Sequence, residues 1–132
     1  MIKNKVVLVV EDEKPLLEAI KLKLEKNNFD VVSARSVEQA KQYVNDLNHI
    51  DVIWLDHYLV GKEDGLDFIA WCKEDDNVKC KIIPIFVVSN TASSDKVGTY
   101  ISLGAYKYFV KSNHKLDEII HEISESLLEK VI

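Results

Sequence analysis

Five short apolar runs recur along the chain, and each is followed by a stretch in which apolar residues return every three or four positions. The runs cover residues 5–10, 29–33, 51–55, 82–88 and 106–110. A run that is apolar at nearly every position is typical of a strand that is covered on both faces. The stretches between the runs have the period of an amphipathic helix. The pattern therefore predicts five strands, each followed by a helix.

Residues at the ends of these stretches indicate where the helices begin and end. Pro15 suits a first helical turn, and Asn27 with Asn28 suits a left-handed stop. Residues 36–39, Ser-Val-Glu-Gln, fit a capping box that opens the second helix. The helices after the third, fourth and fifth strands are predicted to begin at residue 64 or 65, to cover about 94–103, and to cover 116–131. The helix over 94–103 contains Gly98 and few apolar positions, so we expect it to be mobile.

Strand and helix units in succession predict a parallel sheet, because each right-handed crossover between parallel strands needs a helix. The predicted fold class is α/β, a flavodoxin-like (βα)5 three-layer sandwich with a five-stranded parallel sheet of order 2-1-3-4-5. Ligands of such sheets bind outside the carboxyl ends of the strands. This fold supports many functions, so the function must be argued from the residues at that edge.

Composition narrows the class of protein further. At 132 residues, with 47% hydrophobic and 30% charged residues, the chain is predicted to form one domain over residues 1–132. The net charge of -5, with Arg35 as the single arginine, argues against direct binding of nucleic acid. The first apolar run stops at Glu11, too soon for a signal peptide or a membrane span. We therefore expect a cytoplasmic protein that contacts no membrane.

The two cysteines, Cys72 and Cys80, lack the CxxC spacing of a metal or redox site. We expect them to be reduced, small hydrophobic side chains in or beside a helix. No function is assigned to them.

Polar residues follow four of the five predicted strands immediately. They are Glu11 and Asp12 after the first strand, Asp56 after the third, Ser89 after the fourth and Lys111 after the fifth. Parallel strands end at the same edge of a sheet, so these side chains are expected to converge. Three crowded carboxylates repel one another and raise at least one pKa unless a cation neutralises them. A site made of oxygen ligands suits Mg2+.

In this order, the four features resemble the receiver domain of two-component response regulators over essentially the whole chain. The resemblance implies a phosphoacceptor signalling switch of a phosphorelay, which is no enzyme beyond its own phosphorylation and dephosphorylation. Its phosphodonor would be a sensor histidine kinase or a histidine phosphotransfer protein. Its output would pass to a downstream protein target or an effector domain, through the surface of the fourth helix, fifth strand and fifth helix. A phosphorylation-linked dimer is one form that this output can take.

The resemblance also implies a role for each residue of the site. Asp56 is the phosphoacceptor, Asp12 is a direct Mg2+ ligand, and Glu11 acts on the metal through a bound water. The backbone carbonyl of Tyr58 is a further metal ligand. Ser89 and Lys111 contact the phosphoryl group, and Tyr108 acts as an aromatic switch. These roles agree with the chemistry, since the charge on a transferring phosphoryl group must be stabilised from several sides. His57 is expected to point away from the site, because neighbouring strand residues face opposite ways.

Several positions depart from the family pattern. Val60 stands where a proline is usual, Asn90 replaces a small residue after Ser89, and Ser112 replaces the proline after Lys111. We expect these changes to affect kinetics more than chemistry. A cis bond before Ser112 would cost about 3 to 4 kcal/mol, so its isomer is left open. Tyr58 and Asn90 are expected to border the path of the hydrolytic water and to make the aspartyl phosphate long-lived.

Three other functions fit the sequence less well. A Mg2+-dependent phosphatase resembling the haloacid dehalogenase group would carry a second Asp two residues after the nucleophile, where this chain has Tyr58. A flavodoxin would cradle a phosphate after the first strand, where residues 11–13 are all acidic. A degenerate receiver that only binds partners would not need Asp12, Asp56, Ser89 and Lys111 together.

Overall fold

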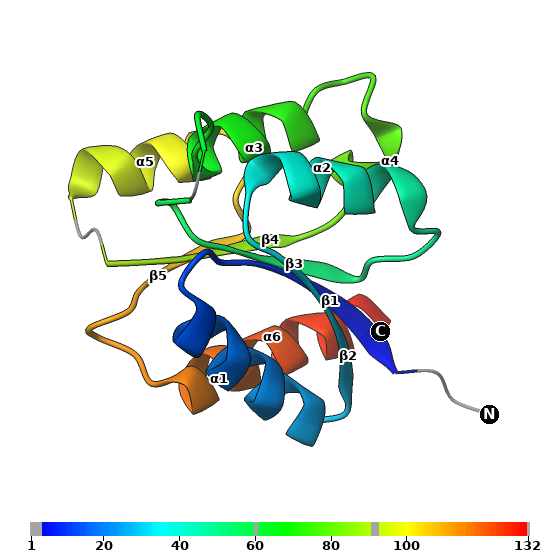
Figure 1. Cartoon of the computed structure of the whole chain (residues 1–132), viewed down its shortest axis with the longest axis vertical. Coiled ribbons are helices and arrows are strands. Elements are labelled where there is room, and N and C mark those ends of the chain that lie inside the picture. The colour runs from blue at the N-terminus through cyan, green and yellow to red at the C-terminus, as the bar shows by residue number, and fades with distance from the viewer. Residues whose placement is uncertain (1–3, 60, 91–92, 132) are drawn as a thin grey trace.

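A five-stranded parallel sheet divides the molecule into two layers of helices (Figure 1). The protein is represented by a computed structural model, which describes residues 4–59, 61–90 and 93–131. The strands are β1 (Lys5–Val10), β2 (Phe29–Ala34), β3 (Val52–Leu55), β4 (Ile85–Ser89) and β5 (Lys107–Val110). Their order is β2-β1-β3-β4-β5, which confirms the predicted fold class and topology.

The helices cover both faces of this sheet. They are α1 (Lys14–Lys26), α2 (Val37–Asp46), α3 (Gly65–Cys72), α4 (Val78–Lys81), α5 (Ser94–Ser102) and α6 (Leu116–Val131). Figure 1 shows α1 and α6 together on one face, and α2, α3, α4 and α5 on the other. None of the helices within the described ranges is long and apolar enough to cross a membrane.

Alternate residues of the strands supply two separate cores. Val9 and Trp54 are neighbours in the sheet and belong to the core under α1 and α6. Leu8 and Ile53 are also neighbours and belong to the core on the opposite face. All four side chains are fully buried. The continuous apolar runs therefore arise because successive residues of one strand face two different helix layers.

The expected start and stop residues of the helices are largely confirmed. Pro15 lies in the first turn of α1, and Asn28 adopts a left-handed φ of 66° after its end. The Ser36 side chain accepts a hydrogen bond from the Gln39 amide, as a helix cap does. The other half of the expected capping box is displaced, because the Gln39 side chain accepts from the amide of Arg35 at 2.8 Å.

The fourth strand is shorter than predicted and is preceded by a helical turn that the pattern did not show. The prediction began at Ile82, whereas β4 begins at Ile85 and the preceding α4 ends at Lys81. Pro84 has no N–H to donate to a sheet, which limits extension of the strand through this residue. Ile82 is 77% exposed, so an apolar residue that lies outside the strand was predicted to belong to it.

The expectation of reduced cysteines is wrong, because Cys72 and Cys80 are joined by a disulfide. The end of α3 and the turn of α4 bring their Cα atoms to 5.1 Å, within the range that a disulfide spans. Sequence spacing alone gave no indication of this fold-back.

Three other expectations have different outcomes. Helix α5 is present, with Tyr100 fully buried, but its mobility stays a prediction. The described peptide bonds are all trans, including the bond between Lys111 and Ser112. Val60 and the side chain of Val131 lie outside the described residues.

Candidate functional site

The three predicted acidic residues meet at the carboxyl edge of the sheet. The amide of Asp56 donates to the Val10 carbonyl at 3.0 Å, which places Asp56 beside the residue that follows β1. One carboxylate oxygen from each of Glu11, Asp12 and Asp56 lies within 4.8 Å of the other two. Glu11 is 1% exposed and Asp56 is 5% exposed, whereas Asp12 is half-buried. Two strand ends therefore assemble one acidic cluster.

Lys111 joins this cluster from the end of β5. Its amide donates to the Ser89 carbonyl at 2.8 Å, which fixes the backbone beside β4. Its ammonium lies 3.0 Å from Glu11 Oε1 and 3.4 Å from Asp56 Oδ1. The structure thus brings together the carboxylates and the lysine that the sequence placed after three separate strands.

The pKa values reflect burial and crowding at this edge. The pKa of Asp56 is raised from 3.8 to about 7. Burial is the largest cause, the charge of Glu11 adds to it, and Lys111 only partly offsets the two. Burial opposes the charge of Lys111, but the carboxylates of Asp56 and Glu11 outweigh it, so the pKa of Lys111 is raised. Without a further cation, Asp56 therefore takes up a proton as the pH falls through about 7, well above the usual range of an aspartate.

The cluster has the donor set of a site for a hard divalent cation. All its side-chain donors are carboxylate oxygens. Glu11 already accepts from Lys111 through Oε1 and from the Glu13 amide through Oε2, at 3.0 and 3.2 Å. The Asp12 carboxylate has no hydrogen bond or ion pair to the described residues. The residues present fit Mg2+, with Asp12 the most open to it.

Arg35 is a residue of this region that sequence reasoning did not place. Its guanidinium donates to the backbone carbonyl of Asp12 from Nε at 3.2 Å and from Nη2 at 2.9 Å. These contacts fix the backbone of the loop after β1 and leave the Asp12 carboxylate free to turn inward. Nothing in the local sequence around Arg35 indicates this contact, which joins the ends of two strands.

Ser89 and Tyr108 are coupled to each other next to the cluster. Ser89 is fully buried at the end of β4, and Tyr108 is half-buried on β5. Burial raises the pKa of Tyr108, while a side-chain hydrogen bond with Ser89 lowers it. The Tyr108 ring also packs against Tyr100 of α5, with 5.7 Å between ring centroids. Ser89 is therefore connected to α5 by contacts through two aromatic rings.

His57 contacts α5 rather than the acidic cluster. Its Nδ1 lies 2.6 Å from the Tyr100 hydroxyl and its Nε2 lies 3.0 Å from the Lys96 ammonium. Burial lowers the pKa of His57, and the charge of Lys96 lowers it further. An ammonium group can only donate, so Nε2 accepts and the ring proton lies on Nδ1. The sequence indicated the direction of the ring but not its two partners.

Gly65 is a second residue that sequence reasoning missed, since it was read only as a helix start. Its amide donates to the His57 carbonyl at 2.9 Å. A Cβ atom at this position would lie 2.7 Å from the Asp56 backbone oxygen and would overlap the Tyr100 hydroxyl. Only glycine lets the start of α3 pack this closely on the loop that carries Asp56.

Tyr58 and Asn90 both lie on the surface beside the site. Tyr58 is 59% exposed, and its ring lies edge to face with His57 and 5.3 Å from the Lys96 ammonium. Among the described residues, no backbone N–H donates to the Tyr58 carbonyl. That carbonyl is free to accept a metal, although its role as a ligand stays a prediction.

The comparisons with known proteins identify the family. The family described as "Response regulator receiver domain" matches residues 7–124, which is most of the chain. The chain belongs to this family, and its class is that of a phosphoacceptor signalling switch. This membership agrees with the resemblance drawn from the strand-end residues, and the phosphatase-like and flavodoxin-like alternatives are not favoured.

Individual relatives support the same assignment. The chain is 31% identical to the phosphate regulon transcriptional regulatory protein PhoB of Klebsiella pneumoniae, over 96% of this chain and 56% of that protein. The chain thus spans about half the length of the curated relatives that it matches. The receiver domain of the Francisella response regulator 1452 has a TM-score of 0.80 at 26% identity, covering 92% of this chain and 94% of that one. The phosphorylated cyanobacterial phytochrome response regulator RcpA has a TM-score of 0.77 at 26% identity, covering 91% and 89%.

Proposed function

We propose that this receiver domain takes a phosphoryl group onto the Asp56 carboxylate in a Mg2+-dependent reaction. The observation that carries the proposal is the convergence of Glu11, Asp12, Asp56 and Lys111 at one edge of the sheet. The donor is a phosphohistidine on a sensor histidine kinase or a histidine phosphotransfer protein, as the family membership implies. We place this reaction in the cytoplasm, where the receiver domain would encounter such a phosphodonor.

The reaction is an in-line displacement at phosphorus. One Asp56 oxygen forms a bond to phosphorus, the bond from phosphorus to the donor's imidazole nitrogen breaks, and the imidazole leaves with a proton from solvent. The attacking carboxylate must be ionised, and its raised pKa of about 7 opposes this in the metal-free protein. Mg2+, when bound to the carboxylate cluster, supplies the positive charge that favours ionised Asp56 and neutralises the phosphoryl oxygens.

The residues around Asp56 then hold the phosphoryl group. The Lys111 ammonium lies 3.4 Å from Asp56 Oδ1 and would pair with a phosphoryl oxygen. Ser89, which is buried at the end of the adjacent strand, would donate its hydroxyl to another oxygen. Together with the metal, these two groups would stabilise charge on three sides of phosphorus.

The switch follows from the competition for Ser89. In this structure Ser89 is hydrogen-bonded to Tyr108, whereas the aspartyl phosphate would draw its hydroxyl toward Asp56. Tyr108 would then lose a partner and repack against Tyr100. Phosphorylation would bias an existing equilibrium of the α5, β5 and α6 surface, which a downstream protein or an effector domain reads. Dimerisation through that surface is a second form of the output.

Incubation with acetyl phosphate tests the proposal. With Mg2+, mass spectrometry should show one added phosphoryl group that hydroxylamine removes, and EDTA should prevent its addition. Asp56→Asn should abolish the adduct, whereas Asp76→Asn, which changes an exposed aspartate, should retain it. An unmodified wild-type protein under these conditions would instead support a degenerate receiver that only binds partners.

A further inference from the structure

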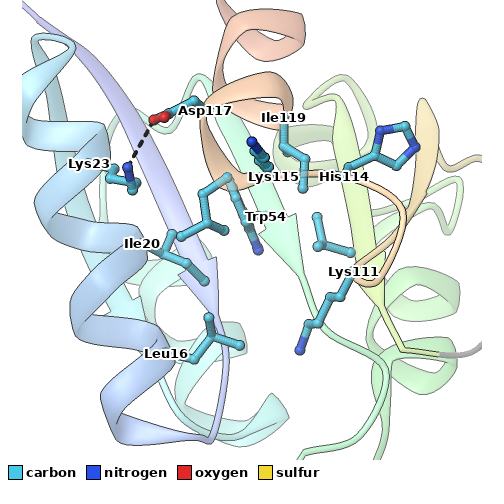
Figure 2. A pocket seen from close by; sticks show the side chains of 11 residues that line it. Leu16, Ile20, Lys23, Trp54, Lys111, His114, Lys115, Asp117 and Ile119 are labelled. Atoms are coloured by element: carbon cyan, nitrogen blue, oxygen red, sulfur yellow. Dashed lines mark hydrogen bonds and ion pairs between the residues drawn. The ribbon is translucent and has the colours of Figure 1, made fainter.

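A cavity of about 410 Å3 lies between α1 and α6, below the carboxyl edge of the sheet. Figure 2 shows Trp54 of β3 between the side chains that α1 contributes and Lys111. We propose that this cavity binds a small carboxylate with an apolar body. The proposal does not depend on the role of Asp56, because Lys111 is the one residue of the phosphorylation site that lines the cavity.

The first argument is an unused hydrogen-bond donor. Trp54 is fully buried. Among the buried side-chain nitrogen and oxygen atoms of the described residues, its Nε1 is the one that has no hydrogen-bond partner. Figure 2 shows this nitrogen among the side chains that line the cavity. A buried N–H without an acceptor is unfavourable, so a ligand that brings an acceptor to it gains free energy on binding. The donor therefore selects a ligand that carries an oxygen acceptor.

The second argument is the apolar wall. The aliphatic side chains that line the cavity are those of Leu16, Ile20, Val88, Leu116 and Ile119. An ordered water usually needs two to four polar partners, and Trp54 offers a single donor among aliphatic side chains. The volume lies within the range of about 300–1,000 Å3 typical of small-molecule sites. A ligand with an apolar body fits these walls better than a lone water does.

The third argument is the charge around the cavity. Lys23, Lys111 and Lys115 line it, while Asp117 is the one lining residue with a carboxylate. Asp117 already pairs with Lys23 at 3.0 Å, in the ion pair drawn between α1 and α6 in Figure 2. The exposed Lys115 ammonium has no ion pair with the described residues. Lys111 is ion-paired with Glu11 and Asp56, so Lys115 is the lining cation whose charge favours a carboxylate over a neutral acceptor.

The indole N–H of Trp54 provides a direct assay by nuclear magnetic resonance. The chain has two tryptophans, so a 15N-labelled sample gives two indole peaks, and Trp71→Phe assigns them. Trp71 lies in α3 and does not line the cavity, so this variant is also the matched control. Titration with benzoate should move the Trp54 indole peak downfield and saturably, while the Trp71 peak stays fixed.

Three comparisons test the proposed contacts. Trp54→Phe keeps an aromatic ring but removes the donor, and it should weaken benzoate binding, followed through the isoleucine methyl peaks, by roughly tenfold. Lys115→Gln should weaken benzoate binding severalfold but leave binding of the neutral analogue benzamide unchanged. Toluene, which has no acceptor, should bind without a downfield shift of the Trp54 peak.

The proposal is overturned if benzoate leaves the Trp54 indole peak of the wild-type protein unmoved, or moves it without saturation. A strong magnetisation transfer from a long-lived water to this N–H, unchanged by benzoate, would assign the cavity to a water. Because these outcomes are read in the wild-type protein, a variant that fails to fold does not remove the test.

Discussion

Replacing Asp56 by asparagine should make the metal-free protein more stable at alkaline pH. Asp56 is 5% exposed and lies beside Glu11, and its pKa is raised from 3.8 to about 7. Because the folded state binds this proton more tightly than the unfolded chain, the associated stability is present below about pH 4. It is lost as pH rises through about 7. Asparagine keeps the shape of the side chain and removes the titration.

The expected magnitude follows from the two pKa values. As the pH rises from about 5 to about 8, the unfolding free energy of the wild-type protein should fall by on the order of 2.5 kcal/mol. The unfolding free energy of Asp56→Asn should not show this fall, because its residue 56 does not titrate. The difference in unfolding free energy between variant and wild type should therefore grow by this amount in favour of the variant. Added Mg2+ should flatten the wild-type dependence, because a bound cation stabilises the ionised carboxylate.

Urea unfolding at several pH values in EDTA, followed by circular dichroism, measures these free energies. The slopes of the unfolding free energy against urea must agree between the proteins for the comparison to hold. Asp76→Asn, at an exposed aspartate, controls for the loss of a carboxylate elsewhere. Parallel pH profiles for wild type and Asp56→Asn would refute the argument that burial and Glu11 hold Asp56 protonated.

Three further predictions concern the loops around the site. In urea unfolding, Gly65→Ala should destabilise the protein by about 2 kcal/mol or more, because the added Cβ would meet the Asp56 backbone. Gly98→Ala should instead stabilise the protein by about 0.5–1 kcal/mol, because Gly98 lies within α5 and has open space around it. Tyr58→Ala or Asn90→Ala should speed loss of the acyl phosphate severalfold under saturating Mg2+; unchanged rates in both would contradict shielding of the phosphate. Asp12→Asn should weaken Mg2+ binding, measured by calorimetry, by about tenfold or more, and an unchanged affinity would remove Asp12 from the metal site.

The sheet and the acidic cluster were predictable because both depend on strand order. Apolar runs such as residues 5–10 indicated strands covered on both faces, and residues that follow parallel strands share one edge. Asp56 and Lys111 could therefore be placed together although they are far apart in the sequence. In the structure their charged groups lie 3.4 Å apart.

Contacts between elements were not predictable in the same way. The His57 contacts with Lys96 and Tyr100 depend on how α5 packs across the sheet, which no local pattern encodes. The disulfide between Cys72 and Cys80 depends on the fold-back between α3 and α4. A short helix and a proline interrupted the apolar run that was read as one strand.

Chemical mapping of the phosphorylated residue tests the central claim most directly. An aspartyl phosphate is reduced by borohydride to homoserine, so protein treated with acetyl phosphate and Mg2+ can be reduced, digested and sequenced by mass spectrometry. We predict homoserine at position 56, with its formation dependent on Mg2+ and absent from Asp56→Asn. Homoserine at Asp12 or at another aspartate, with residue 56 unmodified, would contradict the account.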